Sequence, residues 1–252
     1  MSTSRPFFDF WRMRATFIDA LSPQENFYEA NVLVWASLDA LGSLWARALH
    51  PHLEAQGRSR RRLGDFLARH GGDAFERVSL PALWARSDAL DPAVATGVIR
   101  DRLRAYRGRR VPDVLEERQM RTVSEDPPTT AVLADLADIA AHHVKRNTTV
   151  ADLVLSARFG ELASTEMRCA IVHEGRLGER AHAFDFGGAS QIAPTYLSGV
   201  LGVPPTIGFS PRYMVSVLRS CIDGFERDAT SAGVDPVPPV RGCIVLDLED
   251  ES

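Results

Sequence analysis

Apolar residues recur at helical spacing over most of the chain, and this pattern predicts a mainly α-helical protein. The longest periodic segment covers residues 23–49. Its apolar stripe consists of Tyr28, Val32, Trp35, Leu38, Gly42, Trp45 and Leu49. Ser22 stands where an N-cap is needed, and Glu25 three residues later completes a capping box. We therefore expect a long core helix here, after a shorter helix over residues 8–21.

Several further segments have the length and spacing of helices. They are residues 63–69, 92–104, 130–145, 150–158, 161–177 and 211–227, and Thr149 is the expected N-cap of the fourth. Strand signals are confined to residues 181–186 and 243–248. Residues 187–211 carry no charge and are rich in Gly, Ser and Pro, which is typical of a structured loop. Helices should therefore form most of the ordered chain.

Charge and cysteine content argue against several classes of protein. Among the 252 residues, 33 are acidic and 29 are Lys or Arg, so the formal net charge is -4. That balance argues against a protein that binds nucleic acid through positive charge over its whole surface. The three cysteines, Cys169, Cys221 and Cys243, are far apart and form no CxxC pair. This spacing argues against a disulfide framework and against a cysteine zinc site.

The sequence also predicts a cytoplasmic protein with no membrane partner. Residues 1–10 hold no apolar segment of signal-peptide length before the charged residues Asp9, Arg12 and Arg14. No uninterrupted run of about 18 apolar residues occurs anywhere in the chain.

One carboxylate interrupts the apolar stripe of the long helix. At about 100° per residue, Asp39 lies about 40° from Trp35 and therefore inside the stripe. A buried carboxylate is costly unless it is paired, so Asp39 needs a nearby cation or several donors. Asp39 can have a structural role, in an ion pair or a hydrogen bond between helices. The alternative is a catalytic role.

A second unusual feature is an arginine and a histidine five positions apart in the segment 161–177. On an α-helix Arg168 and His173 are separated by about 140° and flank a face made of Thr165, Cys169 and Val172. A guanidinium can hold a phosphate bidentately, and an imidazole can move a proton near neutral pH. These are the groups that metal-free RNA cleavage requires. The spacing alone also occurs by chance in many proteins.

The stretch Arg168-Cys169-Ala170-Ile171-Val172-His173 fits an R-x4-6-H motif, and the chain here resembles the HEPN superfamily. In the commonest form of the motif a polar residue, often Asn, follows the arginine, whereas this chain has Cys169. The resemblance implies an antiparallel helical bundle that covers residues 7–50 and 130–227. It implies a domain over 1–228 with a helical or irregular insertion at about 51–129, followed by a Pro-rich, acidic and strand-like tail over 229–252.

The same resemblance implies a metal-independent endoribonuclease that needs no cofactor. Two copies of the chain would form a homodimer with Arg168 and His173 of both around one RNA-binding cleft. Glu174, Asp39 and Cys169 are the candidate orienting or accessory residues. Members of the superfamily act in toxin–antitoxin and antiviral defence systems, so an antitoxin or another defence protein is an expected partner.

Two rival interpretations of the function stay open. One is a non-catalytic helical dimer that binds a nucleotide or a protein through the same cleft. The other is a structural dimer in a larger complex, with contacts made by residues 187–211 and by the tail.

Basic clusters at residues 58–62 and 100–110, and the pair Arg176 and Arg180, are candidate contacts for an RNA backbone. Each could equally be a solvated helix face. His50 and His52 lack a third metal ligand at a matching spacing, so no metal site is expected. The chain has no GxSxG nucleophile motif, and its Gly187-Gly188 pair lacks the context of a phosphate loop.

Overall fold

A computed structural model describes residues 5–21, 25–55, 59–91, 97–105, 123–145, 147–183, 185, 188–197 and 206–236. Helices dominate these residues, as the periodicity predicts. The α-helices are α1 Arg5–Asp19, α2 Phe27–Leu49, α3 Pro51–Ala55, α4 Ser59–His70, α5 Leu80–Asp88, α6 Gly97–Ala105, α7 Thr129–Asp135, α8 Val150–Ser156, α9 Phe159–Leu162 and α10 Pro211–Ala232. Short 3-10 turns are η1 Asp73–Glu76, η2 Val123–Glu125 and η4 Gly188–Gln191, and η3 Ala163–Glu174 is a π-helix.

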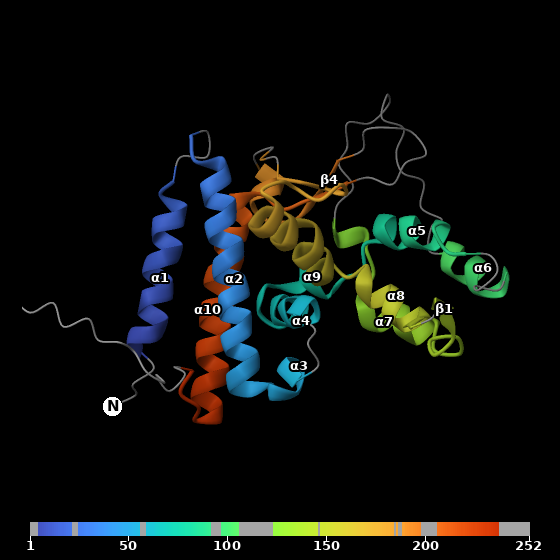
Figure 1. The fold of residues 1–252 in the computed structure, drawn as a ribbon, viewed down its shortest axis with the longest axis horizontal. Helices are drawn as coiled ribbons and strands as arrows, with labels where there is room; N and C mark the ends of the chain where they lie inside the picture. Colours follow the sequence, from blue (N-terminus) through green and yellow to red (C-terminus); the bar gives the residue numbers. More distant parts are fainter. Residues whose placement is uncertain are drawn as a thin grey trace, which may run out of the picture.

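Three long helices, α1, α2 and α10, lie side by side along one part of the molecule (Figure 1). Asp19 near the end of α1 pairs with Arg219, whereas Arg12 earlier in α1 pairs with Glu226 later in α10. These contacts show that α1 runs antiparallel to α10. In Figure 1 α2 and α10 run in the same direction, so α1 is antiparallel to both.

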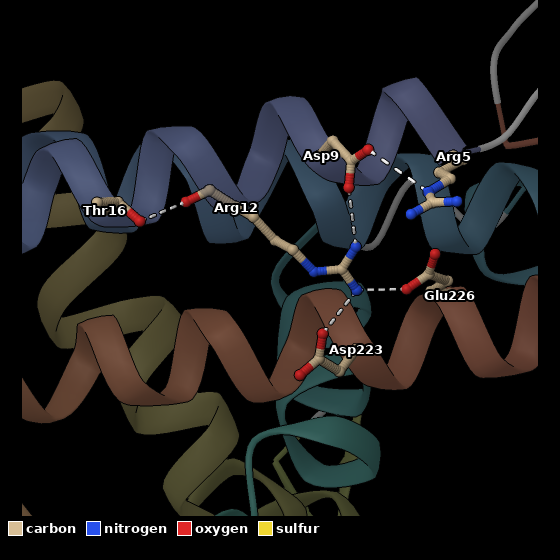
Figure 2. Close-up of polar contacts among 6 residues, drawn as sticks. All are labelled: Arg5, Asp9, Arg12, Thr16, Asp223 and Glu226. Carbon is tan, nitrogen blue, oxygen red and sulfur yellow. Dashed lines mark hydrogen bonds and ion pairs between the residues drawn. The ribbon is translucent and has the colours of Figure 1, made fainter.

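An arginine-centred group of charges joins α1 to α10 (Figure 2). Arg12 donates to Asp223 at 2.8 Å, to Asp9 at 3.4 Å and, most closely, to Glu226. Arg5 adds a weaker contact to Asp9 at 4.0 Å. The Arg12 side chain is 39% exposed, so water screens these pairs and each adds little to stability. Burial of Phe8, among the apolar side chains beneath them, does more to hold α1 in place.

The described helices and strands enclose two hydrophobic clusters. The first is made by α1, α2, α4, η1, α9, η3, α10 and the strands β4 Thr195–Leu197 and β5 Thr206–Gly208. Its largest fully buried side chains include Trp35, Phe66, Phe75, Phe209 and Phe225. The second cluster is made by α5 to α8 and β1 His143–Lys145, with Leu83, Ile99, Leu103, Val132, Val144 and Leu153 among its members.

The division between the clusters differs from the insertion that the resemblance implies at about 51–129. Helix α4 and the turn η1 belong to the first cluster, because Leu63, Phe66 and Phe75 pack in it. The second cluster starts at Val78 and continues past residue 129 to Ala157. The predicted tail also begins later, since α10 reaches Ala232, and residues 237–252 lie outside the described residues together with the strand expected at 243–248.

Two helix predictions need correction. The long core helix begins at Phe27 after Asn26, which makes no side-chain capping hydrogen bond, and the proposed cap Ser22 lies outside the described residues. Tyr28 is 49% exposed and does not belong to the core stripe. The helix expected over 130–145 stops at Asp135 and continues as hydrogen-bonded turns into β1, which pairs with β2 Thr148–Thr149.

The helices expected over 8–21, 63–69, 150–158 and 211–227 are confirmed within a few residues as α1, α4, α8 and α10. Thr149 caps α8 with Asp152 in a reciprocal capping box, as its position predicts. Helix α10 begins at Pro211 and ends before Gly233, whose φ of 65° is favourable only for glycine. The sequence predicts a loop over the uncharged segment 187–211, but its described residues include β4 and β5, and β5 lies between β3 Ala181–His182 and β4 in a three-stranded sheet.

By length and composition α2 is the one helix among the described residues that could cross a membrane. It is also the central helix of the first cluster, where Trp35, Leu38 and Leu41 are fully buried. It packs against α1, α4, α10 and η3, so a core position accounts for its apolar character.

Candidate functional site

The π-helix η3 carries the R-x4-6-H motif. The sequence predicts an α-helix over 161–177, but α9 ends at Leu162 and the chain continues as a π-helix to Glu174. The N–H of Gly175 closes this helix on the carbonyl of Ala170, five residues earlier, and a φ of 67° ends it. π-helical turns are rare and occur often at functional sites.

This geometry brings the two motif residues together. In a π-helix residues five apart are linked by one hydrogen-bonded turn, so their side chains lie on nearly the same side. Nη1 of Arg168 is 3.0 Å from Nε2 of His173, whereas an α-helix would place the two side chains on different faces. Arginine has only donors, so Arg168 donates this hydrogen bond to Nε2 of His173.

Asp39 of α2 holds the other side of the same guanidinium. Nη2 of Arg168 donates a short hydrogen bond to Oδ2 of Asp39. Their side chains are 15% and 19% exposed, so the pair is largely removed from water. The cation that a carboxylate in the apolar stripe requires is therefore Arg168. The sequence identified both residues but did not connect them.

A second arginine reaches the same carboxylate from α4. Nη2 of Arg62 lies 3.9 Å from Oδ1 of Asp39, and the Arg62 side chain is 17% exposed. Sequence reasoning placed Arg62 in a basic cluster with Arg61 and did not assign it to the motif. The helical spacing could have separated the two neighbours, because Arg61 instead pairs with Asp65 at 3.8 Å.

Close backbone contact between α4 and α9 fixes the position of Arg62. A Cβ added at Gly160 would lie 2.5 Å from the carbonyl oxygen of Gly64, so no larger residue fits without a shift. Helix α9 continues directly into η3, which carries Arg168. The pair of glycines therefore places α4 beside the start of the π-helix.

The charge state of Arg168 reflects its surroundings. Burial alone would lower the pKa of its guanidinium, but hydrogen bonds to Asp39 and Cys169 and the charge on Asp39 outweigh that effect and raise the pKa. The contact with Cys169 is long, 3.7 Å from Nη1 to Sγ. Arg168 is thus a permanent cation in a site of low polarity, where it interacts strongly with an anion.

The remaining candidate residues lie outside this cluster. Glu174 is exposed and pairs with Arg176 at 2.8 Å, so it does not orient His173 in the structure. Arg180 is exposed as well. Both arginines remain accessible to a ligand, but the structure does not bring them to the contact between Arg168 and His173.

Tyr28 lies beside the end of the π-helix and was missed as a site residue. A Cβ added at Gly175 would be 3.3 Å from the Tyr28 hydroxyl. The apolar periodicity assigned this ring to the core, yet it is an exposed aromatic beside Gly175, which follows His173 by two residues in the chain. An aromatic at such a position can stack on a nucleobase.

Another largely buried charge group lies between α4 and α9, which pack against each other. Arg158 donates to Asp65 at 2.5 Å and to Glu161 at 3.3 Å. Burial raises the pKa of Glu161 to about 7, partly offset by Arg158. These three side chains are at most 26% exposed, and the more exposed Arg61 also pairs with Asp65.

The histidines outside the motif have other surroundings. His50 packs on Trp45 with ring centres 4.3 Å apart, and His70 lies near Asp228. His142 and His143 are exposed. Within the described ranges no group of three or more His, Cys, Asp or Glu side chains is arranged to hold a metal ion.

Comparisons with protein-family models, with curated proteins and with solved structures give no match to this chain. The residues that point to a function are therefore those of the cluster formed by Asp39, Arg62, Arg168 and His173.

Proposed function

We propose that the protein is a metal-independent endoribonuclease that uses Arg168 and His173. The observation that carries this proposal is the placement of an exposed imidazole 3.0 Å from a guanidinium that Asp39 holds in position. Imidazole supplies proton transfer and guanidinium stabilises negative charge on a phosphate, so neither step requires a metal.

His173 would act on the 2′-hydroxyl of RNA. When the phosphate replaces His173 as the acceptor for Nη1 of Arg168, the freed Nε2 takes the 2′-proton while the 2′-oxygen forms a bond to phosphorus, and the bond from phosphorus to the 5′-oxygen breaks. The imidazole then returns its proton to that 5′-oxygen, which completes the cleavage and leaves a 2′,3′-cyclic phosphate and a 5′-hydroxyl. Arg168 would stabilise the additional negative charge on the phosphorane, and Asp39 is a positioning residue that fixes the guanidinium.

The HEPN-like bundle and the homodimer belong to this proposal. Support for the bundle comes from the motif and from the packing of its helix η3 against the core helix α2. The parallel direction of α2 and α10 differs from a purely antiparallel bundle. A second copy of the chain would bring another Arg168 and His173 to the cleft, and a role in bacterial defence follows from the same resemblance.

The alternative function is non-catalytic binding of a nucleotide by the same residues. One observation favours it: Cys169 occupies the place where the commonest motif has a polar residue, so polar assistance to the reaction is weaker. Direct measurement of nucleotide binding separates this function from a structural dimer, which predicts no binding.

Cleavage in the presence of EDTA tests the proposal. Purified protein is incubated with mixed RNAs, and the products are analysed for 2′,3′-cyclic phosphate ends. Arg168→Ala and His173→Ala should each abolish the products, whereas His142→Ala, at an exposed histidine away from the cluster, should not. Cleavage that survives both motif changes would show that other residues carry the activity, and absence of cleavage by the wild type would favour the binding function.

A further inference from the structure

We propose that Arg62 and Arg168 of a single chain form a binding site for a phosphate group. The chemical class of the ligand rests on the proposed function, because a nuclease must hold a phosphodiester. Binding itself requires no cleavage, so the two can be tested separately.

The charges of the cluster are unbalanced. Two guanidinium groups, from Arg62 and Arg168, share the single carboxylate of Asp39, which leaves one positive charge in excess. All three side chains are less than 20% exposed, so water screens this excess poorly. An anion at the cluster would balance the charge, and the exposed His173 marks the side from which it can enter.

Arg62 has donors to offer such an anion. Its ion pair with Asp39 spans 3.9 Å, which is longer than a hydrogen bond. Nε of Arg62 is buried and has no hydrogen-bond partner among the described residues, and the same is true of Nε of Arg168. A guanidinium carries five N–H donors in a planar fork that matches carboxylate and phosphate oxygens. A largely buried arginine with so few hydrogen bonds is what a site for an oxyanion requires.

The arrangement also keeps the two guanidinium groups close together. Two like charges would separate if nothing lay between them, and Asp39 removes that repulsion. The three residues come from α2, α4 and η3, which pack against one another, so the rigid core holds the site in place. Arg62 therefore supplies from the same chain a second phosphate contact beside the motif.

Two phosphate-containing probes test this site without cleavage. One is inorganic phosphate, and the other is an RNA oligonucleotide in which fluorine replaces every 2′-hydroxyl, so that it cannot be cut. Arg62→Ala should weaken binding of the oligonucleotide about tenfold or more, measured by fluorescence anisotropy. Arg61→Ala is the matched control, since this neighbour on α4 pairs with Asp65 instead, and it should change binding by less than about twofold.

Salt dependence and the His173 ring give two further measurements. Loss of one phosphate contact in Arg62→Ala should lower the slope of log affinity against log salt concentration by about one. Addition of inorganic phosphate should shift the ring proton signals of His173 in NMR spectra of the wild type, and Arg62→Ala should reduce that shift. Arg62→Lys, which keeps the charge but not the fork, should bind with intermediate affinity. This variant also preserves the test if Arg62→Ala does not fold.

The outcomes separate the two proposals. Binding of both probes through Arg62 without any cleavage would retain the phosphate site and reject the nuclease. Cleavage that requires Arg168 and His173 but is indifferent to Arg62 would retain the nuclease and reject this site. The phosphate site would also be rejected if Arg61→Ala and Arg62→Ala had equal effects on binding. The same holds if the wild type bound neither probe.

Discussion

Two groups of charged side chains differ in their ratio of arginines to carboxylates and in how deeply they are buried. Between α1 and α10, the two arginines Arg5 and Arg12 meet three carboxylates, and most of these side chains are well exposed. Between α2, α4 and η3, Arg62 and Arg168 meet one carboxylate, and water reaches little of it. An exposed excess of acid is screened by solvent, whereas a buried excess of base attracts an anion. The first group therefore joins two helices, and the second has the properties of a binding site.

The largest expected effect is on RNA cleavage by the proposed nuclease. Arg168→Ala should lower kcat about 100- to 1000-fold, because a fixed positive charge no longer stabilises the phosphorane. Arg12→Ala removes an arginine of the other group and should leave kcat unchanged. Single-turnover rates on one defined RNA measure both. Equal losses in the two variants would show that the effect comes from folding and not from the site.

The next effect is on stability. Asp39→Ala leaves Arg62 and Arg168 close together with no carboxylate between them, and we expect a loss of about 2–3 kcal/mol in the free energy of unfolding. This is less than for a fully buried ion pair because the side chains retain some exposure. Urea unfolding measures it. Addition of phosphate should restore part of the stability if the anion replaces the missing charge, and no such recovery would argue against an anion site.

The group around Arg158 predicts a pH effect of intermediate size. Arg158 meets Asp65 and Glu161 there. Arg61 also pairs with Asp65, so the charges balance. Burial raises the pKa of Glu161 to about 7 from 4.5. Between pH 4.5 and 7 the folded protein holds a proton that the unfolded chain releases. The free energy of unfolding should therefore fall as pH rises through this range, by roughly 1–3 kcal/mol.

Glu161→Gln should remove most of this fall, because glutamine does not ionise. Urea unfolding at pH 5 and pH 8 gives the difference for each protein. Glu76→Gln, at an exposed glutamate, is the matched control and should keep the fall seen in the wild type. A wild-type stability that is equal at the two pH values would contradict the prediction.

The smallest expected effect concerns the exposed charge group of Arg12 between α1 and α10. Arg12→Ala should cost no more than about 1 kcal/mol in the free energy of unfolding, and the cost should shrink as salt is added. Parallel urea titrations at low and high ionic strength measure this. A cost of several kcal/mol that is insensitive to salt would mean that Arg12 acts through packing against α10 and not through its charge.

Periodicity predicted much of the fold because the spacing of apolar residues along a segment indicates that it is a helix and which of its faces is buried. The long core helix, α8 with its Thr149 cap and the last helix all follow from spacing and capping residues. It failed at residues 136–145, where Leu136, Ile139 and Val144 are buried as a helical face would be. The same three residues reach the second cluster from turns and a strand, so burial alone did not determine the backbone conformation.

For the site, sequence reasoning identified Asp39, Arg168 and His173 as separate candidates. It missed Arg62 because an arginine on a basic helix is usually solvated, and only packing shows which of two neighbours faces inward. It assigned Tyr28 to the core because its spacing matches the stripe, although the ring is exposed beside Gly175.

The sequence by itself determined the helical character, most helix positions and the need of Asp39 for a cation. These follow from interactions between residues a few positions apart and from the cost of an unpaired charge in an apolar face. Only the tertiary structure decided that Arg168 and Arg62 are the cations, since they lie 129 and 23 positions away along the chain. It also decided that a π-helix brings His173 to Arg168, because a change from four- to five-residue hydrogen bonds rotates side chains in a way that residue spacing does not specify.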